Sequence, residues 1–167
     1  VLSAIAMLVL VAGAACADDL LRFRVTSSAS GGRMYCYWRF SGASRTVQAG
    51  DYVEYDVYIN NNVGGLGGIE IVNTDGGSWR DSAGWADQNG LGGHPASDIR
   101  SRSYLRWYHR QLLVPSSVVG KTIARWDVAV DGTYSSDACL SAQYDNVKIT
   151  HGGVTVLNVY QSGAPQY

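Results

Sequence analysis

The sequence has no cluster of basic residues. Its 13 Lys and Arg are scattered among 14 Asp and Glu, which gives a formal net charge of −1. Binding to nucleic acid depends on clustered Lys and Arg, so the charge pattern argues against this class of partner. Beyond residue 17 the sequence also lacks a sustained apolar period of 3.6 residues and any internal repeat, which argues against a helical fold.

Phenylalanine is scarce, with 2 Phe against 11 Tyr and 5 Trp. Tyr and Trp combine an apolar ring with a polar edge, which suits half-exposed binding surfaces better than deep cores. The 20 Gly and the lack of helix-forming stretches favour many turns between short strands. This composition indicates a β-rich domain with an aromatic surface.

Residues 1–17 carry no charge and are almost wholly apolar. They are short for a membrane span, which needs about 20 residues. Ala15-Cys16-Ala17 fits the small-x-small pattern of a signal-peptide cleavage site, and Asp18 follows it directly. We therefore predict a signal peptide at 1–17, truncated at its start, and one secreted domain at 18–167. Two alternatives remain open: a lipidated Cys16, and an apolar stretch that persists as a filament-forming or anchoring helix.

Cleavage after residue 17 would leave two cysteines, Cys36 and Cys139. An even pair of cysteines in an exported chain is typical of a disulfide. A bridge that closes a loop of about a hundred residues stabilises a fold by about 4–5 kcal/mol in chain-entropy models. The alternative is two buried free thiols.

Alternation of apolar and polar residues predicts about eight short strands. In 52–59, for example, Val53, Tyr55 and Val57 fall on one face, and Glu54 and Asp56 on the other. Turn clusters separate the strands, among them 60–68 and the hairpin-type turn 151–153. The expected strands are 20–26, 33–40, 52–59, 69–72, 104–114, 122–130, 139–150 and 154–160. This pattern predicts an all-β fold, an antiparallel two-sheet β-sandwich of the jelly-roll type.

Two segments resemble carbohydrate-binding modules of the galactose-binding-like jelly-roll superfamily. The run 144–150 (YDNVKIT), after the aromatic strand around Trp126, is similar to their closing strand, and 50–55 (GDYVEY) is similar to an early core strand. The resemblance covers most of residues 20–160 and implies a sandwich that binds a glycan. It also implies a structural calcium near the last strands, with Asp145 at the matching position and Asp131 or Glu54 as further ligands.

The segment 79–110 is polar and Gly-rich at its start, yet it holds three of the five Trp. This composition predicts a long functional loop laid over the β scaffold. A sugar site needs carboxylates, amides and Arg around an exposed aromatic ring, and we expect Trp85 to be that ring. The expected ligand-binding residues are Trp79, Arg80, Asp81, Trp85, Asp87, Gln88, Asn89 and His94. The alternative is a solvated loop whose Trp residues fold back as anchors.

A second candidate surface is the outward face of the early strands. There Tyr35 and Tyr37 are expected beside Tyr52 and Tyr58. Ordinary cross-strand pairing of aromatic residues is the alternative explanation of this pattern.

An enzyme is the less favoured interpretation. On a strand, His109 and Arg110 point to opposite faces, so this segment alone does not bring a base and a charge-neutralising group together. Asp81 and Asp87 are a carboxylate pair of the kind that any acidic loop offers. We therefore predict a secreted, non-catalytic domain that binds an extracellular or cell-wall glycan. The alternatives are a self-associating structural subunit of an extracellular filament or surface layer, and a polysaccharide lyase or hydrolase.

Overall fold

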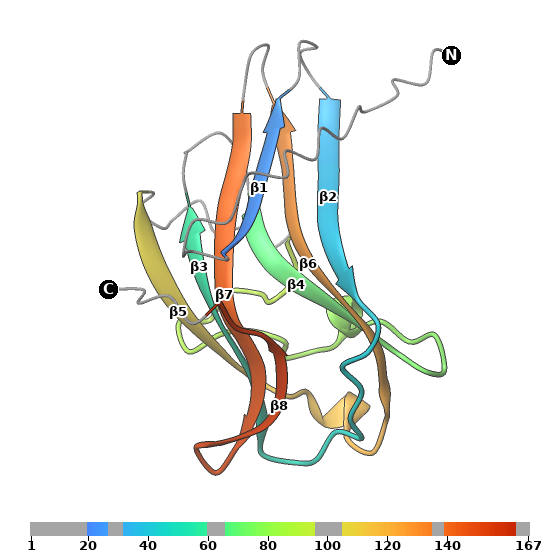
Figure 1. Ribbon diagram of the computed structural model, residues 1–167. Coiled ribbons are helices and arrows are strands. Elements are labelled where there is room, and N and C mark those ends of the chain that lie inside the picture. The colour runs from blue at the N-terminus through green and yellow to red at the C-terminus, as the bar shows by residue number, and fades with distance from the viewer. Residues whose placement is uncertain (1–19, 27–31, 60–65, 96–104, 135–138, 163–167) are drawn as a thin grey trace.

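The protein consists of two antiparallel β-sheets packed face to face (Figure 1). The structure is a computed structural model, which describes residues 20–26, 32–59, 66–95, 105–134 and 139–162. Sheet A has the strand order β1-β7-β3-β5, with β8 also paired to β7, and sheet B has the order β2-β6-β4. The strands are β1 (Leu21–Thr26), β2 (Gly32–Phe40), β3 (Asp51–Ile59), β4 (Leu66–Asn73), β5 (Arg106–Leu113), β6 (Ile123–Tyr134), β7 (Cys139–His151) and β8 (Val154–Tyr160). Two short 3-10 helices, η1 (Trp79–Asp81) and η2 (Ser116–Val118), lie in connections. The predicted antiparallel sandwich is confirmed, and its jelly-roll form stays a prediction.

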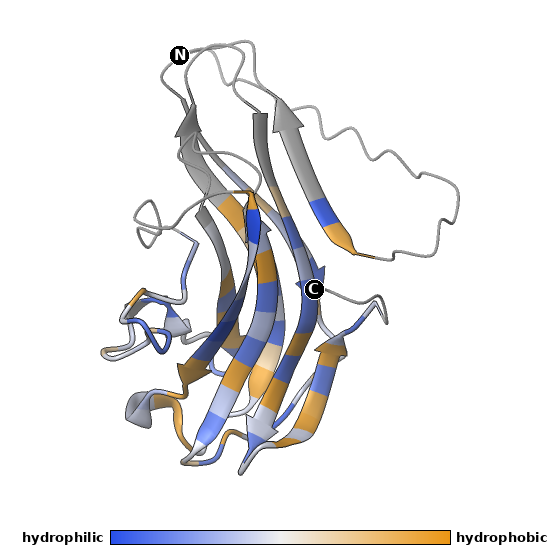
Figure 2. Cartoon of the chain, turned by 90° about the vertical axis from the view of Figure 1, so that its left-hand side faces the viewer, coloured by the Kyte–Doolittle hydropathy of each residue, from blue (hydrophilic) through white to orange (hydrophobic). Residues whose placement is uncertain are grey.

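The core lies between the sheets because every second residue of each central strand points inward. In β3, Val53, Tyr55 and Val57 are fully buried. Facing them from sheet B, Ile71 and Trp126 are equally buried. Alternating hydrophobic and hydrophilic bands along the strands display this pattern in Figure 2. Full burial of one large apolar side chain stabilises a fold by about 1.5–3 kcal/mol, so this alternation supplies the main driving force.

Strand β4 begins at Leu66, three residues earlier than the predicted strand at 69–72. The difference comes from two glycines that read as turn residues in the sequence. A Cβ on Gly67 would lie 2.6 Å from the Tyr144 hydroxyl, and one on Gly68 would lie 2.5 Å from the carbonyl oxygen of Gly93. These glycines allow close approach of neighbouring groups inside a strand, which is the other use of glycine in sheets.

The two open sides of the sandwich differ. On one side, the segment 74–95 covers the edges of β4 and β5 through backbone hydrogen bonds, such as Ile69 N to Gly93 O at 3.0 Å and Gln88 N to Gln111 O at 3.1 Å. On the other side lie β2 and, beside β7, the strands β1 and β8. Exposed apolar side chains stand on this second side, including Trp38 and Val154.

The predicted signal peptide at 1–17 lies outside the described residues. Within the described part of the chain, no helix has the length and apolarity required to cross a membrane. Cys36 is a free, half-buried cysteine in β2 of sheet B, so the structure does not contain the predicted bridge. The backbone of Cys139 lies in β7 of sheet A and its side chain is outside the described set. The pairing of Cys36 with Cys139 stays a prediction.

Candidate functional site

The expected tryptophan platform is closed to solvent. Trp79 is 0% exposed and Trp85 is 5% exposed. Their rings meet edge to face at a centroid distance of 5.2 Å, and the Trp79 indole donates to Asn73 Oδ1 at 2.8 Å. Both rings belong to the hydrophobic core, where Trp85 lies against Gly93 and Leu112. The expectation of an open Trp85 ring is therefore wrong, because the loop uses both rings to fill the gap between the edges of β4 and β5.

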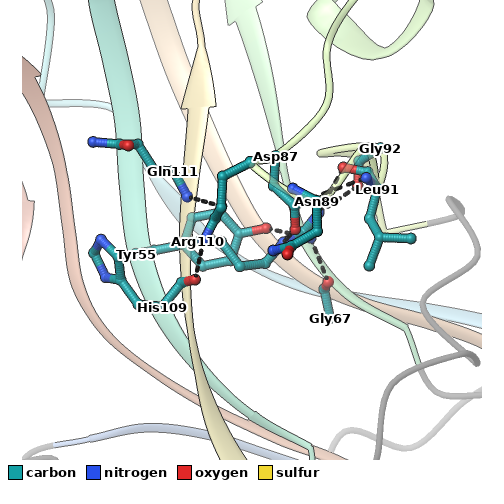
Figure 3. Close-up of polar contacts among 10 residues, drawn as sticks. Tyr55, Gly67, Asp87, Asn89, Leu91, Gly92, His109, Arg110 and Gln111 are labelled. Carbon is teal, nitrogen blue, oxygen red and sulfur yellow. Dashed lines mark hydrogen bonds and ion pairs between the residues drawn. The ribbon is translucent and has the colours of Figure 1, made fainter.

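Asp87, expected to hold sugar hydroxyls, instead forms a buried ion pair (Figure 3). Arg110 Nε donates to Asp87 Oδ2 at 2.9 Å, and the two side chains are 4% and 2% exposed. The other guanidinium N–H groups donate to the Tyr55 hydroxyl at 2.7 Å and to the carbonyl oxygens of Gly67, Leu91 and Gly92 at 3.4, 2.9 and 2.8 Å. All five donors of this guanidinium thus have acceptors, which is what a buried Arg needs.

This network also sets the charge state of Asp87. Burial raises the pKa of the Asp87 carboxyl, but backbone N–H donors of Leu91 and Asn89 and the charge of Arg110 more than offset that effect. The pKa of Asp87 therefore lies below its ordinary value, and the carboxylate stays ionised inside the sandwich. The pair fixes the 87–92 turn to β5 and has no side available to a ligand.

The remaining loop residues are dispersed. His94 is 4% exposed and stacks on Tyr35 of β2 with a centroid distance of 6.2 Å. Gln88 is exposed, but its side chain pairs with the β5 backbone, donating to His109 O at 2.7 Å and accepting from Gln111 N at 2.9 Å. Arg80 and Asn89 are exposed, and the side chain of Asp81 lies outside the described set. The eight predicted residues do not form one site in the described structure.

The second predicted surface is also divided. Tyr35 and Tyr37 lie in β2 of sheet B, whereas Tyr52 and Tyr58 lie in β3 of sheet A. The expectation that these four rings share one face is wrong, because β2 pairs with β6 and β3 pairs with β5 and β7. Alternation along a strand gives the face of each residue but not the sheet to which the strand belongs.

The three residues predicted as calcium ligands are not brought together either. Asp145 accepts from Ser162 N at 2.7 Å and Ser162 Oγ at 2.6 Å. Glu54 Oε1 accepts from Gln111 and Thr150. The backbone of Asp131 lies in sheet B, with its side chain outside the described set. Among the described residues no group of three or more His, Cys, Asp or Glu is placed to hold a metal ion. Calcium binding by Asp145, Asp131 and Glu54 stays a prediction.

The outer face of sheet A gathers the polar and aromatic groups that the loop does not offer. We use this name for the outward side chains of the three neighbouring strands β3, β5 and β7. Strand register places Tyr58 beside Trp107 and Gln143, Asp56 beside His109, and Glu54 beside Gln111 and Lys148. The Tyr58 and Trp107 rings lie 5.5 Å apart at 56°. The members of the face are Tyr52, Glu54, Asp56, Tyr58, Trp107, His109, Gln111, Leu113, Gln143, Asn146, Lys148 and Thr150.

The centre of this face holds two adjacent hydrogen-bond clusters, one around Glu54 and one around Asp56. Glu54 Oε1 accepts from Gln111 Nε2 at 2.8 Å and from Thr150 Oγ1 at 2.6 Å. Asp56 accepts from Asn146 Nδ2 at 2.6 Å and contacts His109 Nδ1 at 2.8 Å. Because every member is held by a neighbour on an adjacent strand, the face is preorganised.

A β-bulge aims Asn146 into this network. The register of β3 with β7 shifts between Glu54 and Asp56, and Asn146 adopts a φ of 52° at that point. Asn tolerates this left-handed conformation better than most residues. Bulges are frequent next to functional sites because they redirect a side chain. The bulge falls within the 144–150 run that carries the family resemblance.

The same contacts shift two pKa values. The hydrogen bond with Asp56, together with the charges of Asp56 and Glu54, raises the pKa of His109 above its ordinary value despite partial burial and the nearby Lys148. Burial alone would raise the pKa of Glu54. Hydrogen bonds from Thr150 and Gln111 and the charges of Lys148 and His109 outweigh burial, so the pKa of Glu54 lies below its ordinary value. The resulting face is a mixture of carboxylates and a readily protonated imidazole.

The sequence carried a signal for the buried Arg110 and for one strand of the outer face. In the expected strand 104–114, Arg110 falls on the apolar face with Tyr108 and Leu112, and an inward Arg requires a buried acid such as Asp87. The opposite face of that strand carries Trp107, His109 and Gln111.

No family model matches this chain, and no curated protein matches it.

Proposed function

We propose that the protein is a non-catalytic carbohydrate-binding domain whose glycan lies along the outer face of sheet A. The observation that carries this proposal is the placement of the Tyr58–Trp107 ring pair beside a row of carboxylate, amide and imidazole groups on one face. A sugar presents flat C–H surfaces for stacking and hydroxyls for hydrogen bonds, so it matches both parts. The segment 74–95, with Trp79 and Trp85 buried, then covers the edges of β4 and β5.

The length of the face favours an extended chain over a single sugar ring. Tyr52 and Tyr58 lie at opposite ends of the same face of β3, six residues apart. At a rise of about 3.3 Å per residue, they are separated by about 20 Å. The strip between them is polar. A polysaccharide segment laid along β3 would meet an aromatic ring at each end and hydrogen-bonding groups between.

The environment of the two carboxylates favours binding without catalysis. Glycoside hydrolysis needs a pair of carboxyl groups that reach the scissile bond. Glu54 and Asp56 each accept hydrogen bonds from protein donors, and their side chains are only 11% and 4% exposed. Arg110, considered as the charge-neutralising group of a lyase, points inward and is fully engaged. The proposed partner is an extracellular or cell-wall glycan, in line with the signal peptide predicted at 1–17.

Affinity electrophoresis through gels containing soluble polysaccharides tests the proposal. Trp107→Ala is expected to weaken retention about tenfold, which corresponds to about 1.4 kcal/mol of lost stacking. Trp38→Ala is the matched control, because Trp38 is an exposed Trp on sheet B. Equal retention of the Trp107 variant and the native protein in every gel that retains the protein would reject this location of the site.

A second candidate function is a self-assembling structural subunit, favoured by the edge of sheet A formed by β8. This strand, VTVLNVY, contains no charge and no Pro, and Val154 and Val156 are 65% and 38% exposed. Proteins usually protect edge strands with Lys, Pro or covering loops, since a bare edge can pair with another chain. A hollow of about 490 Å³ between 39–43 and 157–159 continues this surface.

Sedimentation analysis distinguishes this second function. If the domain assembles through β8, Val156→Lys is expected to convert oligomers to monomers, because a charge on an edge strand opposes pairing. Lys introduced at Ser117, an exposed position in η2 outside β8, is the control. A native protein that is monomeric at every concentration tested would rule this function out.

A further inference from the structure

Two side-chain nitrogens on the outer face of sheet A, Lys148 Nζ and His109 Nε2, face one carboxylate oxygen without a direct hydrogen bond to it. Lys148 Nζ lies 3.7 Å and His109 Nε2 lies 3.8 Å from the same oxygen, Glu54 Oε2. Both distances exceed those of direct hydrogen bonds. Among the described residues, neither nitrogen has a hydrogen-bond partner. The gap around Glu54 Oε2 is therefore open to a ligand atom or a bridging water.

The imidazole is held so that its unused nitrogen faces this gap. Asp56 Oδ1 binds His109 Nδ1 at 2.8 Å, and Asn146 Nδ2 binds the other Asp56 oxygen at 2.6 Å. With Nδ1 fixed in this way, Nε2 is directed toward Glu54 and Lys148. The charged groups that face His109 are Asp56 and Glu54 from β3 and Lys148 from β7.

Charge is layered across this face. The side chains of His109 and Lys148 are 43% and 29% exposed, whereas those of Glu54 and Asp56 are 11% and 4% exposed. The carboxylates lie beneath, with both Asp56 oxygens and Glu54 Oε1 held by protein groups, and Lys148 and the protonated His109 stand toward solvent with N–H groups to offer. An incoming ligand meets the cations first, and charge-assisted hydrogen bonds to carboxylate or sulfate are the strongest that such donors make.

We propose that the saccharide bound at this face carries an anionic group, a carboxylate or a sulfate ester, which is held between His109 Nε2 and Lys148 Nζ. This inference rests on the function proposed above and names its ligand class. His109 and Trp107 are two residues apart on one face of β5, about 6.4–6.8 Å. A sugar ring stacked on Trp107 therefore brings a substituent within reach of the two cations. Because the whole chain has a formal net charge of −1, general attraction to polyanions does not explain such binding.

The test uses two pairs of polymers that share a backbone and differ in charge. Polygalacturonate is compared with its methyl ester for carboxylate, and dextran sulfate with dextran for sulfate, by titration calorimetry at about pH 5.5. This pH is about one unit below the ordinary pKa of His, so the imidazole is protonated. We expect one of the charged polymers to bind about tenfold or more tightly than its neutral counterpart. The charged polymer that binds identifies the anionic group.

Three variants assign the effect to this gap. Lys148→Met is expected to remove most of the preference for the charged polymer, and Lys121→Met, at an exposed Lys paired with Asp75 elsewhere, to leave it unchanged. Glu54→Gln removes the anion that competes with the ligand, so it is expected to strengthen binding of the charged polymer. A circular dichroism spectrum like that of the native protein shows that each variant is folded.

The outcomes separate the two proposals. Equal binding of a charged polymer and its neutral counterpart, both weakened by Trp107→Ala, would overturn the anionic ligand and leave the carbohydrate site standing. A preference that survives Lys148→Met in a folded protein would overturn the placement between His109 and Lys148. Failure to bind any of the four polymers would count against the anionic ligand, and failure across neutral glycans as well would reject the proposed function.

Discussion

Arg110 Nε of β5 donates to Asp87 Oδ2 of the segment 74–95 at 2.9 Å, in a pair that is almost completely buried. This contact joins the segment to the sandwich, and the two tryptophans of 74–95, Trp79 and Trp85, are buried beside it. We therefore assign the segment a structural role and propose that the ligand meets the opposite side of β5, at Trp107, His109 and Gln111.

Breaking the Arg110–Asp87 pair should destabilise the fold strongly. Arg110→Ala leaves a buried carboxylate without its partner, which typically costs about 3–5 kcal/mol. Urea unfolding measures the change in the free energy of unfolding. Arg39→Ala is the control, since Arg39 is 44% exposed and Asp127 also binds Arg125; its expected cost is much smaller, because solvent screens an exposed ion pair. Similar losses in the two variants would contradict the structural role of Asp87.

Removing Trp85 should affect stability and not ligand affinity. Trp85→Ala leaves a cavity between the sheet edges, with an expected loss of about 3–5 kcal/mol. Glycan binding, measured at a temperature where the variant is still folded, is expected to match that of the native protein. A variant of native stability that no longer binds glycan would restore Trp85 as a ligand platform.

Stability should fall in acid. The pKa values of Asp51, Glu54 and Asp87 lie below their ordinary values, because hydrogen bonds and nearby cations outweigh the effect of burial. A carboxyl with a lowered folded pKa stabilises the fold above its unfolded pKa, about 4, and loses that contribution as pH falls through the folded pKa. Thermal melts from pH 6 to pH 2 should thus show a falling melting temperature below about pH 4. Asp87→Asn should melt at a lower temperature at pH 6 and show a shallower acid decline; an unchanged slope would contradict the linkage.

His109 should act in the opposite direction. Its pKa is raised, chiefly by the hydrogen bond with Asp56. A group with a raised folded pKa stabilises the fold below its unfolded pKa, about 6.5, and that contribution is lost as pH rises through the folded pKa. A titration of the His109 ring by NMR is expected to give a pKa above 6.5, and Asp56→Asn to lower it. A His109 pKa below 6.5 would contradict the geometry of this pair.

Cys36 should react with alkylating reagents without prior reduction. It is a free cysteine in the structure, and burial raises the pKa of its thiol, so labelling of the folded protein should be slow. In unfolding denaturant, iodoacetamide is expected to label Cys36 fully without reductant, as read by mass spectrometry. Labelling that appears only after reduction would instead support the predicted bridge to Cys139.

The strands were predictable because alternation of apolar residues directly reflects burial. Val53, Tyr55 and Val57 mark β3 in the sequence as clearly as in the structure. The extension of β4 through Gly67 and Gly68 was not predictable, because glycine is typical both of turns and of strands that a neighbouring group approaches closely. Only the three-dimensional neighbours, Tyr144 and Gly93, distinguish the two cases. Long-range pairing decides which sheet a strand joins, and for that reason Tyr35 and Tyr58 were wrongly placed on one face.

The burial of Trp79 and Trp85 was not predicted, for a related reason. The sequence places Trp85 and Asp87 two residues apart. Whether their side chains face solvent or the core depends on the contacts that anchor the loop. The decisive anchor, Arg110, is 23 residues away from Asp87. Its signal was an Arg on the apolar face of a strand, which implies a buried acidic partner. The outer face of sheet A depends on which strands are neighbours in the sheet, and the alternation of residues in the sequence does not give that order.

The most direct measurement is an NMR titration of the five Trp indole N–H resonances with the polysaccharide that retains the protein in affinity gels. If glycan binds along the outer face of sheet A, the Trp107 signal shifts in proportion to the bound fraction, and the signals of Trp79 and Trp85 stay in place. Shifts of Trp79 and Trp85 with an unmoved Trp107 would contradict the account and return the site to the loop.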